Sequence, residues 1–245
     1  MHPFFTDDEN TCHYKFAMPL SNTDIITDMD SAGVSVFCGS VLSAPITNVE
    51  TMKRNNAHAL KLREIFGERY IPGVHVHPAF VDESITELEA AFAAGIKLIG
   101  ELVPYYDKWS YADRGIYDIL SSVKRTDVTV SLHTMDHSQM EDMAAAFPNL
   151  TFVFAHPGQR SSAEKHVEIM KRRDNVYLDI SGTGLERYGS LRYLCDEVGA
   201  QRILFGSDYP INNLQMYIGG VMSERLSDTE RELIFAGNAK RLLGL

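Results

Sequence analysis

Short apolar runs rich in β-branched residues alternate with helical stretches along most of this 245-residue chain. Each run has the length of a strand, and apolar residues recur at helical spacing in the stretch that follows it. Strands that alternate with helices form a parallel sheet with right-handed crossovers. Strands are predicted at 34–37, 70–78, 96–102, 128–133, 150–156, 176–181 and 203–207, and helices at 22–32, 47–66, 83–94, 113–124, 138–146, 161–171, 186–198 and from residues 228 and 238.

Together with a stub of another strand at the N-terminus, these segments make eight strand–helix units. A (β/α)8 barrel typically needs about 250 residues, which is close to the length of this chain. No glycine-rich phosphate-binding loop follows any of the strands, so the sequence does not favour an open nucleotide-binding sheet. We therefore predict a single α/β domain over residues 1–245, a TIM barrel whose first strand is short or truncated.

Groups that bind metals or move protons follow three of the predicted strands. Asp208 ends the run in FGSDYP, while His133 and His156 end the runs in SLHT and FAHPG. In a parallel barrel the C-terminal ends of all strands lie on one face, so these residues are expected to converge. Imidazole and carboxylate side chains are ligands of zinc and of related divalent cations.

Composition excludes several classes of protein. The formal net charge is −10 and the longest basic cluster is Lys171-Arg172-Arg173, so nucleic-acid binding is disfavoured. No apolar segment approaches the roughly 20 residues of a membrane span, and the N-terminus has no signal-peptide pattern. The three cysteines are widely separated and lack CxxC spacing, which is typical of reduced thiols. We therefore expect a cytoplasmic protein with no membrane partner.

The order of several motifs resembles one known family. MDSAGVSVF, IKLIGEL, SLHT, FAHPG, FGSDYP and FAGNAKRLL follow one another at roughly the spacing of barrel units. This set resembles the metal-dependent hydrolases of the amidohydrolase superfamily, of the amidohydrolase-2 type, with some likeness to TatD-type enzymes. The resemblance covers most of the chain and implies a TIM barrel with a metal centre at the strand ends.

The resemblance also implies a set of metal ligands. They are Glu101, His133, His156, Asp208 and His2, where His2 occupies the place of the second histidine of a His-x-His pair on the first strand. The first histidine of that pair would precede Met1, so either residues lie upstream or one ligand is lost. The implied cofactor is one or two divalent ions, with Zn²⁺ favoured and Mn²⁺, Fe²⁺ or Co²⁺ as alternatives.

Other assignments of these residues stay open. Asp208 could cap the next turn, His133 and His156 could be hydrogen-bonded interior histidines, and Glu101 could be solvated. Lys97 would be the ligand if the centre used a carboxylated lysine. The pair His75 and His77 has the His-x-His spacing, but taking its strand as the first would leave too few strands for a barrel.

Substrate contacts are predicted from the loop 103–111 and from the segment after the strand 176–181. Tyr105 and Trp109 offer aromatic rings with polar edges, which suit an organic and partly apolar substrate. Arg187 could bind a substrate carboxylate, and His77 could face the pocket from its strand. Packing of these rings within the protein is the alternative interpretation.

These residues favour a metal-dependent hydrolase that activates water to cleave a small amide, ester or lactone. Asp208 and His156 are its predicted catalytic residues, and Asp208 would pass the proton of the nucleophile to the leaving group. One alternative is a metal-dependent decarboxylase of an aromatic or unsaturated acid, and another is a ligand-binding barrel that has lost catalysis. The predicted partner is a small molecule, with a homo-oligomer left open.

Overall fold

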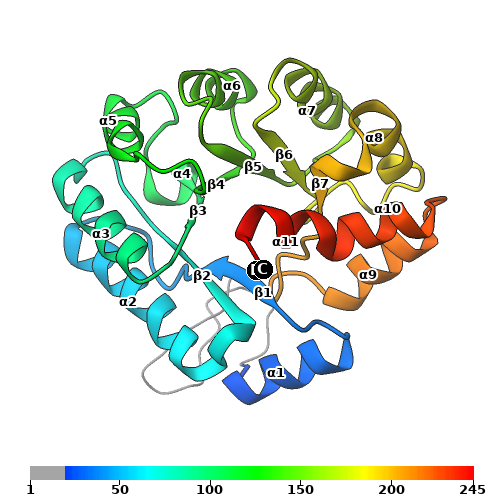
Figure 1. Cartoon of the computed structure of the whole chain (residues 1–245), viewed down its shortest axis with the longest axis horizontal. Helices are drawn as coiled ribbons and strands as arrows, with labels where there is room; N and C mark the ends of the chain where they lie inside the picture. The colour runs from blue at the N-terminus through cyan, green and yellow to red at the C-terminus, as the bar shows by residue number, and fades with distance from the viewer. Residues whose placement is uncertain (1–19) are drawn as a thin grey trace.

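Seven parallel strands form one sheet in the part of the chain that the structure describes. The computed structural model describes residues 20–245, and the strands follow one another in the sheet in chain order. This arrangement confirms the predicted TIM-barrel architecture, while the expected first strand falls on residues 1–19, outside the described part (Figure 1). The strands are β1 (Phe37–Ser40), β2 (Tyr70–Val74), β3 (Leu98–Leu102), β4 (Thr129–His133), β5 (Thr151–Ala155), β6 (Val176–Asp179) and β7 (Ile203–Leu204).

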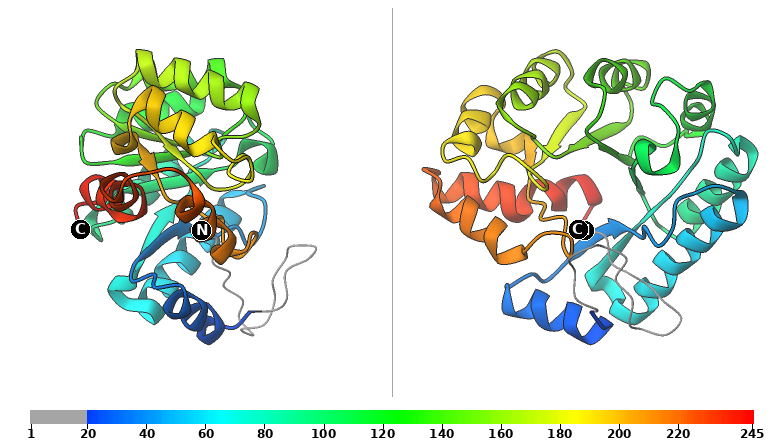
Figure 2. Two further views of the ribbon diagram at one scale, coloured as in Figure 1. Left: turned by 90° about the vertical axis from the view of Figure 1, so that its right-hand side faces the viewer. Right: turned by 180° about the vertical axis from the view of Figure 1, so that it is seen from behind.

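Helices surround the strands on the outside of the curved sheet, as two further views show (Figure 2). Their ends follow local signals, such as the Ser21 capping box of the first helix and Gly67 after the second, at a φ of 63°. None of the helices within residues 20–245 is long and apolar enough to cross a bilayer. The helices are α1 (Asn22–Ser31), α2 (Val49–Phe66), α3 (Val81–Ala93), α4 (Pro104–Asp107), α5 (Arg114–Ser122), α6 (His137–Ala146), α7 (Arg160–Arg172), α8 (Ser190–Val198), α9 (Leu214–Ser223), α10 (Asp228–Glu232) and α11 (Asn238–Leu243).

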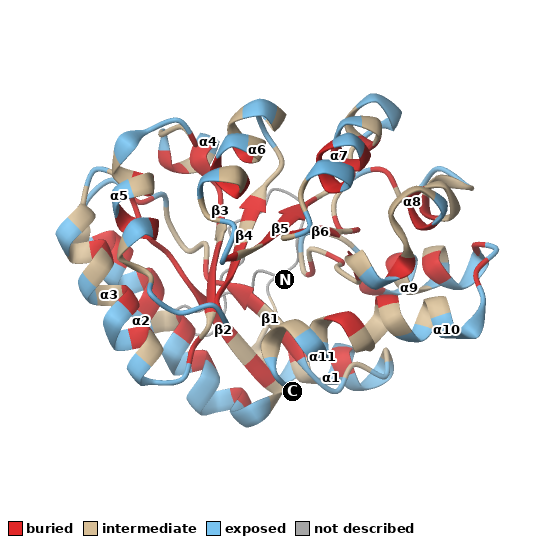
Figure 3. Cartoon of the chain, turned by 45° about the horizontal axis from the view of Figure 1, so that its top comes forward, coloured by how far each residue is buried: buried red, intermediate tan, exposed pale blue. Residues whose placement is uncertain are grey.

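The main core lies between the strands and the outer helices (Figure 3). Val130 and Leu132 of β4 and Phe152 and Phe154 of β5 are all 0% exposed and belong to this core. Because side chains alternate along a strand, the residues between them face the barrel interior. The last residue of β4, His133, therefore points inward rather than into the helical layer.

Two helices and the bounds of several strands differ from the sequence prediction. Strand β2 ends at Val74 rather than at residue 78, and β7 ends at Leu204 rather than at residue 207. The strand predicted at 34–37 begins only at Phe37, where burial and pairing with β2 begin; Val36 is still 41% exposed. Helix α4 lies in the segment predicted as an aromatic loop, and α9 was not predicted because adjacent glycines at 219 and 220 interrupt its pattern. Helix α4 directly follows the end of β3, on the face where the strands end.

On that face a buried carboxylate joins helix α4 to the loop after β1. Asp107 is 7% exposed, and its Oδ1 accepts a hydrogen bond of 2.7 Å from the backbone amide of Ile46. Burial raises the pKa of Asp107 from 3.8 to about 6, although the bond from Ile46 opposes this. The ionised form of Asp107 is therefore costly to the fold.

Replacing Asp107 by asparagine is expected to stabilise the fold at alkaline pH. A carboxyl whose pKa is raised on folding contributes stability below its unfolded pKa and loses it as pH rises through the folded value. The free energy of unfolding of the wild type should thus fall as the pH rises from about 4 to about 6. Asp107→Asn keeps the acceptor atom and has no ionisable group there, so its stability should not fall in this range. The difference in the free energy of unfolding should reach at most about 3 kcal/mol at pH 8 and vanish near pH 4. Urea unfolding at both pH values measures it, and the exposed Asp113→Asn variant is the control.

Candidate metal centre

The register of the sheet places several strand ends at one level. His133 pairs with Ala155, Ala155 pairs with Asp179, and Asp179 pairs with Leu204. The residue after Ala155 is His156, and Asp208 follows the end of β7. The strand ends therefore bring together residues that are far apart in the sequence, as the sequence predicts.

An irregularity in β3 directs Glu101 to the interior. Between Ile99 and Leu102 the register with β4 shifts by one residue, because Ile99 pairs with Val130 and Leu102 with Leu132. Ile99 and Leu102 both lie in the outer core, so the bulged pair between them leaves Glu101 on the inner side. Gly100 has a φ of 89°, and a Cβ there would lie 2.4 Å from the Leu102 amide nitrogen. Only glycine fits this turn of the backbone.

His156 reaches the interior through an unusual backbone conformation. By alternation it would share the outer face with Phe152 and Phe154, but its φ of 72° is left-handed and breaks that alternation. Asp208, four residues beyond Leu204 at the end of β7, has a φ of 58°. Left-handed non-glycine residues cost about 1–3 kcal/mol and persist where the surrounding structure enforces them, often at functional sites.

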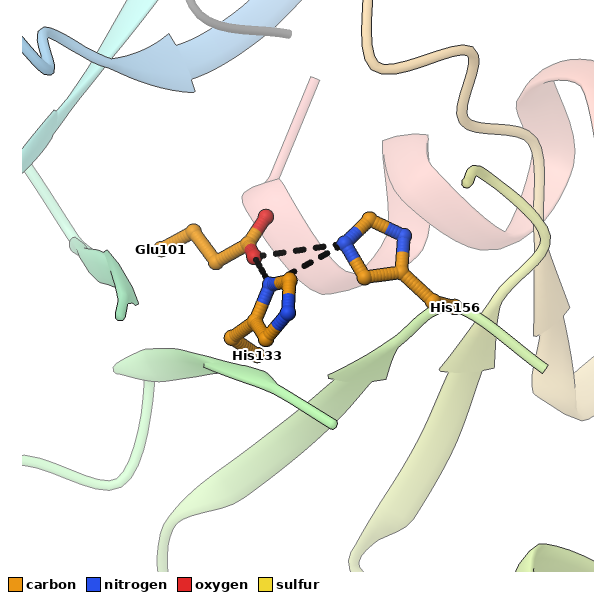
Figure 4. A group of neighbouring side chains, drawn as sticks. All are labelled: Glu101, His133 and His156. Carbon is orange, nitrogen blue, oxygen red and sulfur yellow. Dashed lines mark hydrogen bonds and ion pairs between the residues drawn. The ribbon is translucent and has the colours of Figure 1, made fainter. Parts of the chain in front are cut away.

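Glu101, His133 and His156 form the one candidate metal group within residues 20–245, and their ligand atoms all lie within 4.8 Å of one another (Figure 4). Glu101 Oε1 is 2.7 Å from His133 Nδ1 and 3.6 Å from His156 Nε2. The two histidine nitrogens are 3.1 Å apart. Three ligand atoms thus face a common point.

The electrostatics of this cluster suit a cation. Burial lowers the pKa of His156, but the hydrogen bond and charge of Glu101, with the charges of Asp208 and Asp179, outweigh it and raise the pKa to about 9. These negative charges favour a positive charge at the centre of the cluster. One carboxylate and two imidazoles are also a donor set that zinc and manganese accept, so the residues fit a divalent cation.

Neighbouring groups hold the ring of His156 and the backbone of His133 in place. Ser181 Oγ lies 3.1 Å from His156 Nδ1, which leaves Nε2 to face the cluster. The Ser181 amide donates to Asp179 Oδ1 at 2.6 Å. The hydroxyl of Tyr111 lies 2.9 Å from the carbonyl oxygen of His133. The Ser181 bond orients the ring of His156 as a ligand, and the Tyr111 bond holds the backbone of His133.

The other predicted ligands have different positions. Asp208 is not in the three-residue group, although its charge contributes to the raised pKa of His156. His2 lies outside the described residues. His77 is 7% exposed on the segment after β2, where its Nε2 is 3.3 Å from the carbonyl oxygen of Asp107.

The residues predicted to contact the substrate also lie in different surroundings. Tyr105 is 60% exposed, and its ring lies edge to face with His133 at a centroid distance of 5.0 Å. Trp109 instead packs edge to face against Tyr111 at 5.5 Å and adjoins the main core. Arg187 is exposed in the loop after β6. Of these three, Tyr105 is the residue that contacts the cluster.

Sequence reasoning missed Asp107, Tyr111 and Asp179 as supporting residues. Asp179 carries a usable signal, because it is a carboxylate at the C-terminal end of a strand, like the predicted site residues. No local pattern distinguishes Asp107 or Tyr111 from the other polar and aromatic residues of the segment 103–111. Their roles depend on contacts with other segments.

Comparison with known proteins agrees with this geometry. A family model described as amidohydrolase matches residues 13–245. The chain belongs to the amidohydrolase family. This confirms the resemblance seen in the sequence motifs, and none of the curated proteins matches this member in sequence.

Solved structures of similar fold include several decarboxylases. A 2,6-dihydroxybenzoate decarboxylase from Rhizobium is 16% identical, with a TM-score of 0.76 over 99% of this chain and 96% of that one. A 5-carboxyvanillate decarboxylase from Sphingomonas paucimobilis is 15% identical, with a TM-score of 0.71 over 90% and 82%. A dihydroxybenzoic acid decarboxylase from Polaromonas, with bound manganese and the inhibitor 2-nitroresorcinol, is 17% identical, with a TM-score of 0.66 over 93% and 87%. At these identities the likeness establishes the shared fold.

Proposed function

We propose that this protein is a metal-dependent decarboxylase of an aromatic carboxylic acid. The observation that carries the proposal is the exposed ring of Tyr105 beside His133, because an aromatic wall at a metal centre suits a planar aromatic substrate. The decarboxylases of similar fold act on hydroxylated benzoic acids, which supports the same substrate class.

Glu101, His133 and His156 are the residues that would hold the cation. A divalent cation there supplies positive charge that binds and stabilises anionic oxygens of the substrate. Asp208 is our candidate for the residue that delivers a proton to the ring carbon bearing the carboxylate. The bond from that carbon to the carboxylate then breaks, its electron pair restores the aromatic ring, and CO2 leaves.

Tyr105 would contact the substrate ring from the open side of the centre. Partial burial of the phenol, followed by the charges of Glu101 and Asp208, raises the pKa of Tyr105 above its ordinary value. Its hydroxyl, like any phenol, is protonated at neutral pH and can donate a hydrogen bond to an anionic substrate. Arg187 remains a candidate for the substrate carboxylate from the loop after β6.

Hydrolysis of a small amide, ester or lactone is the second candidate, and membership of the amidohydrolase family favours it. Both reactions use the same ligand set, and they differ in product. Protein loaded with Zn²⁺ or with Mn²⁺ should be incubated with a panel of hydroxybenzoates and, separately, with simple esters and lactones. We expect metal-dependent release of CO2 from a hydroxybenzoate; metal-dependent ester or lactone cleavage without CO2 would instead support hydrolysis.

Metal binding without turnover of either panel would favour the ligand-binding barrel. Metal content measured on protein purified without chelator therefore accompanies the assay. A centre that neither retains nor takes up Zn²⁺ or Mn²⁺ would contradict both catalytic proposals.

A further inference from the structure

The backbone amide of Ile46 and the ring of His77 both form hydrogen bonds with Asp107 of helix α4. Asp107, the last residue of α4, receives the Ile46 amide on its side chain and His77 on its backbone carbonyl. We propose that Asp107 and His77 form a clasp that positions Tyr105 at the metal centre and so sets how tightly the substrate is held. The effect on substrate rests on the proposed function, whereas the positioning of Tyr105 does not.

The first half of the clasp connects α4 to the loop after β1. Ile46 is 1% exposed, so the hydrogen bond of 2.7 Å between its amide and Asp107 Oδ1 is shielded from water. A buried amide that loses its acceptor costs about 1–3 kcal/mol, which strongly favours the bonded arrangement. The carboxylate thus fixes α4 against a loop that is 61 residues distant in the chain.

The second half of the clasp depends on the tautomer of His77. The backbone amide of Ala79 is 3.2 Å from His77 Nδ1, and an amide can only donate, so Nδ1 must be the acceptor. The proton of the neutral ring is then on Nε2, which donates to the carbonyl oxygen of Asp107 at 3.3 Å. Burial lowers the pKa of His77, in keeping with a neutral ring.

Both nitrogens of His77 are therefore used within the protein. Neither offers a lone pair to a metal ion or a polar contact to a substrate in this arrangement. The ring is also packed, with centroids 5.0 Å from Phe80 and 6.2 Å from Trp109. His77 is thus better placed as a positioning residue than as a substrate contact.

Tyr105 lies two residues before Asp107 in the single turn of α4. Trp109, just beyond α4, donates its backbone amide to the Pro104 carbonyl, so the turn behaves as a unit. When Asp107 and His77 hold one end of this turn, the exposed ring of Tyr105 is kept 5.0 Å from the ring of His133. Loss of either bond should let Tyr105 move away from the cluster.

Kinetics of a double-mutant cycle test the clasp. Asp107→Ala, His77→Phe and Tyr105→Ala should each raise KM for the aromatic acid about tenfold, with kcat changed less than about threefold. Asp107→Asn retains the acceptor and should keep the KM of the wild type. In a Tyr105→Ala background Asp107→Ala should add almost nothing, because both changes remove the same contact. Full additivity, or an unchanged KM in Asp107→Ala, would overturn the proposal.

A second measurement needs no activity. The edge-to-face ring of Tyr105 should shift the imidazole proton resonances of His133, and Tyr105→Ala removes that shift. In zinc-loaded protein Asp107→Ala should move these resonances to the Tyr105→Ala values, while the exposed Asp113→Ala should leave them in place. If the resonances of Asp107→Ala match those of the wild type, the clasp is wrong even when CO2 is released. If they move and no CO2 is released, the proposed reaction fails and the clasp stands.

Discussion

Replacing His133 by alanine is expected to cause large losses of both metal affinity and turnover. His133 Nδ1 is the atom common to the two shortest distances of the cluster, 2.7 Å to Glu101 Oε1 and 3.1 Å to His156 Nε2. Without it, one carboxylate and one imidazole remain in the three-residue group. We expect the affinity for Zn²⁺ or Mn²⁺ to fall at least about a hundredfold. The rate of CO2 release should fall on the order of a thousandfold or more.

A nearby histidine offers a matched control for this change. His137 lies at the start of α6, four residues further along the chain, and its Nε2 is 3.3 Å from Ser162 Oγ rather than in the cluster. Titration calorimetry with each metal should show normal affinity in His137→Ala and an affinity at least about a hundredfold lower in His133→Ala. Equal affinity in the two variants would remove His133 from the metal centre, whichever reaction the protein catalyses.

The positions of the strand ends were predictable from the sequence because they depend on local patterns. The run before His133 alternates between outer-core and inner residues, so a strand with an inward histidine at its end follows directly. The family motifs then indicated which of these residues belong to one site. Predicted helices begin or end within a few residues of the observed positions, except where glycines or short turns interrupt the pattern.

The direction in which individual side chains point was less predictable, because it depends on local backbone conformation. Alternation alone would put His156 on the outer face, and only its left-handed conformation brings the ring inward. Glu101 likewise depends on the bulge at Gly100, which pairing with β4 defines. Asp107 and Ser181 acquire their roles through partners 61 and 25 residues away. Such contacts leave no local mark in the sequence.

Replacing Gly182 by alanine is expected to weaken metal binding by displacing the ring of His156. The φ of Gly182 is 69°, and a Cβ there would lie 2.2 Å from Nδ1 and 2.6 Å from Cγ of His156. Because contacts this short do not occur, Gly182→Ala must displace the imidazole and break its bond to Ser181. We expect metal affinity to fall about 10- to 100-fold, as when other groups that orient a ligand are lost, with a parallel loss of CO2 release. Ser181→Ala, which removes the bond without a collision, should give a smaller loss.

The control for Gly182→Ala lies in the same loop. Gly189 has a φ of 87°, and a Cβ there would meet nothing within 4 Å. Alanine at either position adopts a left-handed conformation at a cost of about 1–2 kcal/mol, so both variants should lose similar stability from backbone strain. Only Gly182→Ala should also lose metal affinity, because only its methyl group meets the ring of His156. Calorimetric titration with Zn²⁺ and urea unfolding of the metal-free protein separate the two effects. Equal metal affinity in the two variants would mean that His156 does not bind the ion in the orientation described.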